Sequence, residues 1–219
     1  MSLKEHTVKS YDKDLQSIAG TVDEMCDLVS ISIDMVSEMI LNNRDDYLDK
    51  ITTHDYKINA LDFLIEKKVT AMLALRQPLA VDLRYIVSAL KVSSNLERVG
   101  DQAKSIIKKI NRIGAKSFDE KVKKSLLEMV NLSKEMVRDS VIAFNDQDIE
   151  KADLVLREDD EIDAIYSGLF GILEGENFTK QQAEKIINIL FIAKSFERLA
   201  DHSTNIAEIT KYVVTGETK

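Results

Sequence analysis

The stretch LRYIVSALKVSSNLERVGDQAKSIIKKI, Leu83–Ile110, has a counterpart in the second half of the chain, EKIINILFIAKSFERLADHSTNIAEIT, Glu184–Thr210. In both stretches apolar residues recur at spacings of three and four, a pattern that predicts long amphipathic helices. Both also contain one acidic element, ERVGD at Glu97–Asp101 and ERLAD at Glu197–Asp201. The repetition indicates that the chain consists of two related helical units.

The sequence around these stretches follows one plan in both halves. Apolar stripes predict three helices in each unit, and polar breaks such as LNNRDD before Tyr47 and AFNDQD before Ile149 separate them. The third helix is expected to begin at RQPLAVDLR, with Pro78 in its first turn, where a missing backbone N–H costs nothing. The six predicted helices span approximately 15–40, 47–75, 78–113, 122–144, 149–170 and 179–213.

The composition favours an all-α fold. The chain has 7 glycines, 1 proline and no tryptophan, whereas turn-rich β folds draw heavily on glycine and proline. The stretch GAKS is the best boundary, because Gly114 suits a helix C-terminus and Ser117, with Glu120 three residues later, suits a helix N-terminus. We therefore predict two tandem three-helix bundles, 1–114 and 115–219, related by the internal repeat and a pseudo-two-fold axis.

Charge and cysteine content restrict the functional class. Thirty basic and 38 acidic residues give a net charge of −8, which argues against nucleic acid as a partner. The basic cluster Lys104, Lys108, Lys109, Arg112 and Lys116 suits the negative end of a helix dipole. A single cysteine, Cys26, rules out an internal disulfide and fits a reducing compartment. Without a membrane-length apolar run or a signal-peptide pattern, a soluble cytoplasmic protein is expected.

Acidic side chains recur at the spacing of one helical turn. Such a spacing aims two carboxylates at one point. The stripe Leu83, Ile86, Val87 and Leu90 extrapolates to Glu97 and Asp101, so these acids are expected to continue a buried face. Antiparallel packing is expected to add Asp55 and Asn59 of the preceding helix in the first unit. In the second unit the levels of the two helices match less well, and a shared site depends on how the glycine-rich connection between them runs. The candidate metal ligands are Asp55, Asn59, Glu97 and Asp101 in the first unit, and Asp159, Asp163, Glu197 and Asp201 in the second.

Two explanations account for carboxylates on a buried face, where they repel one another unless neutralised. One is a hard metal ion such as magnesium, manganese, calcium or iron, which prefers oxygen ligands. The other is a purely structural helical scaffold, in which Arg98, Arg198 or a lysine of a neighbouring helix pairs with the acids and no metal binds. The residues alone do not choose between the two.

Catalytic motifs are missing from the sequence. None of the three histidines follows a glutamate at the spacing of a di-iron oxidase, and glycine-rich phosphate loops and nucleophile elbows are absent. His202 is expected on the surface or in a salt bridge. We therefore expect a protein that is not an enzyme.

Several motifs in the same order give the chain its resemblance to a known family. RQPLAVDLR, the pairs in DYKIN and DDEID, and the two ERxxD elements, within a duplicated three-helix unit, resemble the PhoU family of phosphate-uptake regulators over essentially the whole chain. The family's acidic motif falls on Glu97 with Asp101 and on Glu197 with Asp201. The resemblance implies metal ions at each bundle, multinuclear iron or zinc ahead of manganese or magnesium. Asn59 stands where the family usually has aspartate, so the first site is expected to bind less strongly.

The resemblance also implies a regulatory role. Proteins of the family act with the phosphate ABC transporter and a membrane sensor histidine kinase, and they keep the phosphate-starvation response off when phosphate is plentiful. The chain is therefore expected to be a metal-binding adaptor that reaches the membrane through its partners. Its oligomeric state is left open between a monomer and a homodimer.

Overall fold

The computed structural model describes residues 3–42, 46–115, 118–173 and 179–217, with side chains from Tyr11 onward. These residues form six α-helices and no strand, which confirms the all-α fold. The helices are α1 Leu3–Asn42, α2 Tyr47–Arg76, α3 Ala80–Ile113, α4 Glu120–Asp146, α5 Ile149–Leu173 and α6 Lys180–Thr215.

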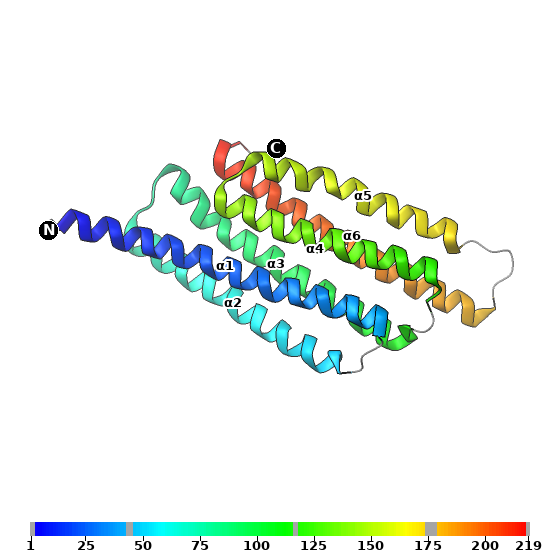
Figure 1. Cartoon of the computed structure of the whole chain (residues 1–219). Coiled ribbons are helices and arrows are strands. Elements are labelled where there is room, and N and C mark those ends of the chain that lie inside the picture. Colours follow the sequence, from blue (N-terminus) through cyan, green and yellow to red (C-terminus); the bar gives the residue numbers. More distant parts are fainter. Residues whose placement is uncertain (1–2, 43–45, 116–117, 174–178, 218–219) are drawn as a thin grey trace.

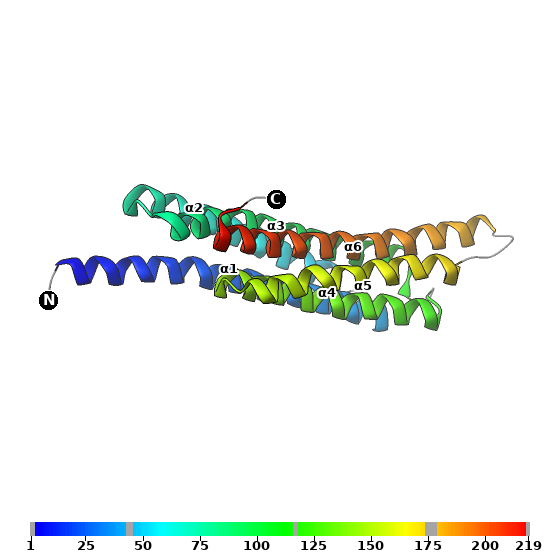
Figure 2. The ribbon, with the colours of Figure 1, turned by 90° about the horizontal axis from the view of Figure 1, so that it is seen from above.

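The helices run lengthwise beside one another, with α2 and α5 at opposite edges (Figure 1). Seen from above, α2, α3 and α6 form one layer and α1, α4 and α5 form the other (Figure 2). The helices of each unit contact one another, and the pairs α3 with α6 and α1 with α4 join the two units. The division into domains 1–114 and 115–219 stays a prediction.

The third helix of each unit lies at the centre of this arrangement. Arg84, near the start of α3, donates from Nε to the carbonyl oxygen of Val213 near the end of α6 at 2.8 Å. Lys109, near the end of α3, reaches Ser195 in the first half of α6 at 2.8 Å. The two helices therefore run antiparallel, and the acidic elements lie near the middle of each.

Aliphatic side chains from all six helices fill the core, with two aromatic rings at the junction between the units. Tyr85 of α3 stacks on Phe144 of α4, with 4.7 Å between ring centroids. The Tyr85 hydroxyl donates to Asn145 Oδ1 at 3.0 Å. Stacked aromatic pairs contribute beyond their buried area, so this contact helps to fix one unit against the other.

Helix α1 begins earlier than its apolar stripe predicts, at Leu3 instead of Leu15. Two polar contacts hold its first half against the connection between α2 and α3. Tyr11 donates its hydroxyl to Asp82 Oδ2 at 2.9 Å, and Arg76 pairs with Asp14 at 2.9 Å. The first turns of α1 are therefore helical although they are polar, because residues of α2 and α3 bind them.

The helix ends agree with the sequence at some boundaries and differ at others. Gly114 follows α3 with φ 75° and donates to Ile110 O at 2.8 Å, so it caps the helix as predicted. The predicted N-cap Ser117 lies outside the described residues, and the side chain that caps α4 is Asp119, which accepts from the Val122 amide. Pro78 precedes α3, which starts at Ala80. A proline sterically disfavours helical backbone at the residue before it, which here is Gln77. Helix α2 accordingly ends at Arg76.

In the described part of the chain, every helix is either too short or too polar to cross a membrane.

Candidate functional site

The acids of α3 lie at the edge of the buried face and not within it. Ile86 is fully buried, but Leu83 and Val87 are 40% and 39% exposed, so the predicted stripe is turned toward solvent. The inward positions are taken by residues such as Ala89 and Val92 instead. Helical periodicity fixes which residues share a face, but neighbouring helices decide how much of that face is covered. The side chains of Glu97 and Asp101 are accordingly 24% and 44% exposed.

A close approach of α2 to α3 brings the first set of acids together. Gly100 permits this contact, because a Cβ at that position would lie 2.9 Å from Ile58 Cδ1. One turn before Ile58, Asp55 is only 7% exposed, and its Oδ2 meets Lys104 Nζ at 2.5 Å. A buried carboxylate needs such a partner. Lys104 therefore neutralises Asp55 directly.

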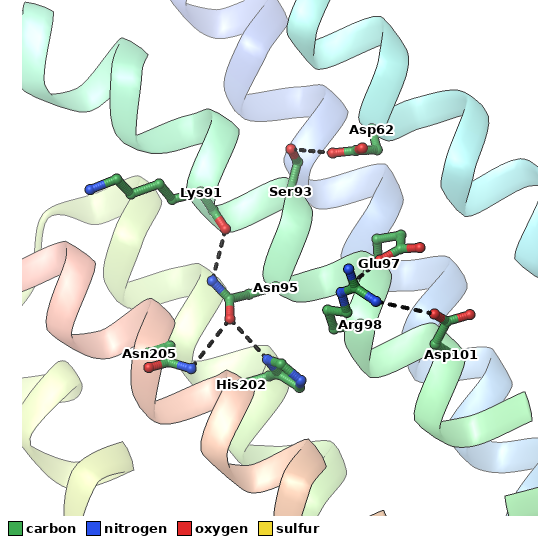
Figure 3. A network of polar contacts seen from close by, with 9 residues as sticks. All are labelled: Asp62, Lys91, Ser93, Asn95, Glu97, Arg98, Asp101, His202 and Asn205. Atoms are coloured by element: carbon green, nitrogen blue, oxygen red, sulfur yellow. Dashed lines mark hydrogen bonds and ion pairs between the residues drawn. The ribbon is translucent and has the colours of Figure 1, made fainter. Parts of the chain in front are cut away.

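Glu97 and Asp101 have a cation of their own. Arg98 lies 3.5 Å from Glu97 and 3.9 Å from Asp101, between the two carboxylates (Figure 3). Burial raises the pKa of Glu97, and the carboxylates of Asp101, Asp62 and Asp55 raise it further, while Arg98 lowers it. Asn59 is exposed on α2, one turn after Asp55. The first set is thus a row of acids that lysine and arginine largely neutralise.

The second set is more strongly repulsive. Burial raises the pKa of Asp159 to about 6, and the carboxylates of Asp163, Asp201, Glu197 and Asp160 all contribute. Burial also raises the pKa of Asp201, with Glu197 and Asp163 adding to it. All four predicted acids of α5 and α6 therefore lie within electrostatic reach of one another. The sequence left this juxtaposition in doubt, because the two helices are joined through a connection of different length.

One lysine approaches the second set, but it contacts Glu197 and not the aspartate of the preceding helix, as Lys104 does in the first set. Lys194 forms an ion pair with Glu197 on the same helix, and its own side chain is 41% exposed. Among the described residues, Asp159 Oδ1 is buried and accepts no hydrogen bond. Alignment of ERLAD with ERVGD places Thr204 where the first unit has Lys104. The second unit therefore lacks the lysine that neutralises the equivalent aspartate, and it has Asp163 where the first has Asn59.

The two sets differ in how well they fit a bound metal ion. Over the described ranges, no three carboxylate, histidine or cysteine side chains are already gathered as the ligands of one ion. Asp159, Asp163, Glu197 and Asp201 nevertheless supply only oxygen donors, including the unpartnered Asp159 Oδ1, which is the donor chemistry of hard cations. The first set fits less well, because Lys104 already holds Asp55 and Asn59 carries no charge.

Sequence reasoning missed several residues of these sets. Asp62 lies two turns after Asp55 on α2, accepts from Ser93 Oγ at 2.6 Å and acts on Glu97. Its heptad spacing from Asp55 was the available signal. Lys104 was assigned to the helix dipole, whereas it binds Asp55. In the same basic cluster, Lys109 binds Ser105 and Ser195 and Arg112 pairs with Glu184, while Lys116 lies outside the described residues.

The prediction for His202 was wrong. The ring is half-buried between α6 and α3, and its Nδ1 lies 3.0 Å from Asn95 Oδ1 (Figure 3). Asn95 donates its amide to Lys91 O at 2.8 Å, so its Oδ1 is an acceptor and His202 Nδ1 carries the hydrogen. Burial lowers the pKa of His202, with Arg98 adding to the effect. His202 therefore acts as a neutral hydrogen-bond donor between the two units.

The raised pKa of Asp159 predicts a pH dependence of stability. The folded protein binds the Asp159 proton more tightly than the unfolded chain, whose value is about 3.8. Its contribution to stability is therefore full below pH 3.8 and is lost as the pH rises to about 6. We expect Asp159→Asn to stabilise the metal-free protein at pH 7, and we expect this gain to vanish at the acid end of the window. Urea unfolding of parent and variant across the window measures the difference.

A matched variant controls for the loss of one charge. Glu128→Gln removes a carboxylate from an exposed position of α4, so its effect on stability should be small at every pH. The quantity to compare is the stability of the variant minus that of the parent. Glu97, Glu158 and Asp201 also have raised pKa values, so they add a pH dependence that both proteins share. A constant stability difference between Asp159→Asn and the parent over the whole window would contradict the prediction.

Comparison with known proteins gives a consistent result. The model of the PhoU domain matches residues 22–110 and again 126–210. A protein of Zymomonas mobilis named phosphate-specific transport system accessory protein PhoU homolog is 35% identical over 219 residues, covering 97% of this chain and 90% of that protein. The crystal structure of the phosphate transport system regulatory protein PhoU from Streptococcus pneumoniae superposes with a TM-score of 0.84 at 26% identity, over 94% of this chain and 98% of the other. That of PhoU from Pseudomonas aeruginosa also gives 0.84, at 24% identity over 94% and 100% of the two chains.

Proposed function

The chain belongs to the PhoU family, and we propose that it regulates phosphate uptake as an accessory protein of a phosphate transport system. The observation that carries the proposal is that the PhoU domain matches both units of a chain whose relatives, named as transport-system accessory proteins, align over nearly their full length. Fold similarity alone would support no function.

We further propose that the protein acts by binding partners and catalyses no reaction. Its partners are the phosphate ABC transporter and a sensor histidine kinase, whose signalling it holds off when phosphate is plentiful. Support comes from the acidic sets, in which arginine and lysine pair with carboxylates. Such charged surfaces suit recognition of a partner.

The two acidic sets are assigned different roles in this proposal. The first set is mainly structural, since Lys104 and Arg98 already neutralise it. The second set is the stronger metal site, with Asp159, Asp163, Glu197 and Asp201 as ligands, because its charges repel one another and Asp159 Oδ1 is unpartnered within the described chain. A bound metal cation, with iron or zinc ahead of manganese or magnesium, would supply positive charge there. The four carboxylates would then need to turn toward a common point.

Metal loading offers a means of regulation. The second set is a negative surface between α5 and α6 in the metal-free protein, and neutralising it changes which partner surface it attracts. Partner binding that differs between loaded and unloaded protein couples the two sites by the same free energy in both directions. Binding of the transporter or kinase is therefore proposed to depend on metal.

The function is tested by deleting the gene in its host and measuring a phosphate-starvation reporter in phosphate-rich medium. We expect the reporter to be active in the deletion strain and silent when the parent gene is restored. A strain that carries Asp159→Asn with Glu197→Gln should respond in between, because the metal site is lost while the fold is kept. A reporter that stays silent in the deletion strain contradicts the regulatory role.

A further inference from the structure

A cavity of about 810 Å³ opens between α3 and α6. It contains none of the eight candidate metal ligands, and it lies beside the polar network in which Asn95 joins His202 and Asn205 (Figure 3). Its size is within the range of small-molecule sites, roughly 300–1,000 Å³. The cavity is therefore large enough for an organic ligand, and the acidic sets do not account for it.

The floor of the cavity is apolar and includes one aromatic ring. Leu90 of α3 and Ile209 and Tyr212 of α6 line it, all of them partly exposed. Lys91 Nζ lies 5.9 Å from the centroid of the Tyr212 ring. The ammonium group lies over the ring, so a flat ligand ring stacked on Tyr212 has this group close by, and a negative substituent that reaches it gains a charge-assisted hydrogen bond.

The charged groups around the cavity select the charge of the ligand. Lys211 also lines the cavity, but Asp153 holds its ammonium group at 2.7 Å. Lys91 forms no ion pair with any carboxylate of the described residues. Glu208 and Glu217 line the cavity as well, and they disfavour an ion with several negative charges. The cavity is therefore net negative as a whole, and Lys91 offers a local contact for only one anionic group, which disfavours free phosphate and polyphosphates.

The amide network fixes a hydrogen-bonding edge. Asn95 is held by its bonds to Lys91 O and to His202, and its Oδ1 accepts from Asn205 Nδ2 at 3.4 Å (Figure 3). That bond uses one amide hydrogen of Asn205, and the side-chain oxygen and the second hydrogen remain for a ligand. Asn205 is exposed at the cavity wall.

The pseudo-two-fold repeat shows that this cavity does not follow from helix packing alone. At the equivalent place in the other half, Lys109 and Arg112 stand where the cavity has Ile209 and Tyr212. Lys109 crosses there from α3 and donates to Ser195 of α6 at 2.8 Å. The apolar floor is therefore particular to this end of the junction between α3 and α6.

We propose that this cavity binds a small planar aromatic molecule with one anionic group. Its ring stacks on Tyr212, its anionic group meets Lys91, and its polar edge bonds Asn205. This inference is independent of the metal site and of the proposed phosphate regulation.

The probe for the test is 8-anilinonaphthalene-1-sulfonate, which has aromatic rings and one negative charge, and its fluorescence reports binding. We expect saturable binding at one site per chain. Lys91→Met and Tyr212→Leu should each weaken it about tenfold, since each removes one contact of the size given for charge-assisted or aromatic pairs. Ser94→Phe, which fills the cavity from an exposed position, should abolish binding.

Matched variants and ligands separate the cavity from other surfaces. Lys108→Met and Tyr56→Leu remove an exposed lysine of α3 and an exposed tyrosine of α2 elsewhere and should leave binding unchanged. As competitors, 2-naphthol, which has the ring without the charge, should act about tenfold more weakly than the probe, and inorganic phosphate should not compete. Binding that is absent, that Lys91→Met leaves intact, or that inorganic phosphate displaces would overturn the proposal. The Lys91 side chain is exposed, so its variant is expected to fold.

Discussion

We expect Lys104→Met to lower the free energy of unfolding of the metal-free protein by about 3 kcal/mol, the lower end of the range for breaking a buried ion pair. Asp55 and Lys104 have side chains 9% and 21% exposed and lie 2.5 Å apart. Removal of the lysine leaves a carboxylate of a residue only 7% exposed with no cation at its oxygen. The cost is set mainly by that stranded charge and only slightly by the attraction that is lost. Urea unfolding followed by circular dichroism measures it.

Two further variants identify the stranded charge as the cause. Lys104→Met combined with Asp55→Asn should recover most of the loss, because an amide of the same shape needs no counter-charge. Lys108→Met, on the same helix but exposed, should change stability by less than about 0.5 kcal/mol. If the double variant is as unstable as Lys104→Met, the loss comes from side-chain packing, and the assigned role of Lys104 is wrong.

The single variant also probes why the two units differ. With Lys104 gone, Asp55 resembles Asp159, which has Thr204 at the lysine position. Added metal that binds Asp55, Glu97 and Asp101 would then restore part of the lost stability, because a ligand that binds only the folded state stabilises it. The parent, whose lysine already occupies Asp55, should gain less from the same metal.

Periodicity was sufficient for the helices and for the lines of acids, because both depend on local spacing within one helix. Periodicity failed where the packing of a neighbouring helix determines which side chains are paired or covered. Lys104 is near the end of a helix in sequence, which suggested a dipole contact, yet the close approach of Ile58 to Gly100 brings Asp55 within its reach. Likewise Leu83 and Val87 share a face with Ile86, but the structure leaves them exposed.

The charge state of the second set also could not be predicted from spacing. The sequence showed Asp159 and Asp163 on one helix and Glu197 and Asp201 on another, but matching their levels depended on the connection between α5 and α6. The structure is needed to show that the four carboxylates repel one another, because there Asp163, Glu197 and Asp201 all raise the pKa of Asp159. The metal assignment itself stays a prediction, and it is the second set that tests it most directly.

Glu197→Gln combined with Asp201→Asn should lower the affinity for metal by on the order of 100-fold, because two charged oxygen ligands become neutral at almost unchanged volume. Helix content should hardly change, since Glu197 and Asp201 lie outside the fully buried core. Purified protein is loaded with iron, zinc or manganese, dialysed, and analysed for metal by mass spectrometry, with parent and variant treated alike.

The internal repeat supplies the matched control for this measurement. Glu97→Gln with Asp101→Asn makes the same changes at the equivalent positions of α3, where Arg98 bridges the two acids and Lys104 holds Asp55. Its bound metal should fall much less, because ligand charge governs the affinity of hard cations and the first set has less charge to offer. Equal metal content in the parent and the Glu197 and Asp201 variant would refute the site, and equal losses in the two double variants would refute the assigned difference between the units. A protein that retains no metal under any loading condition would favour the structural scaffold, in which Lys194 and Arg198 alone offset the repulsion that raises the pKa of Asp159 and Asp201.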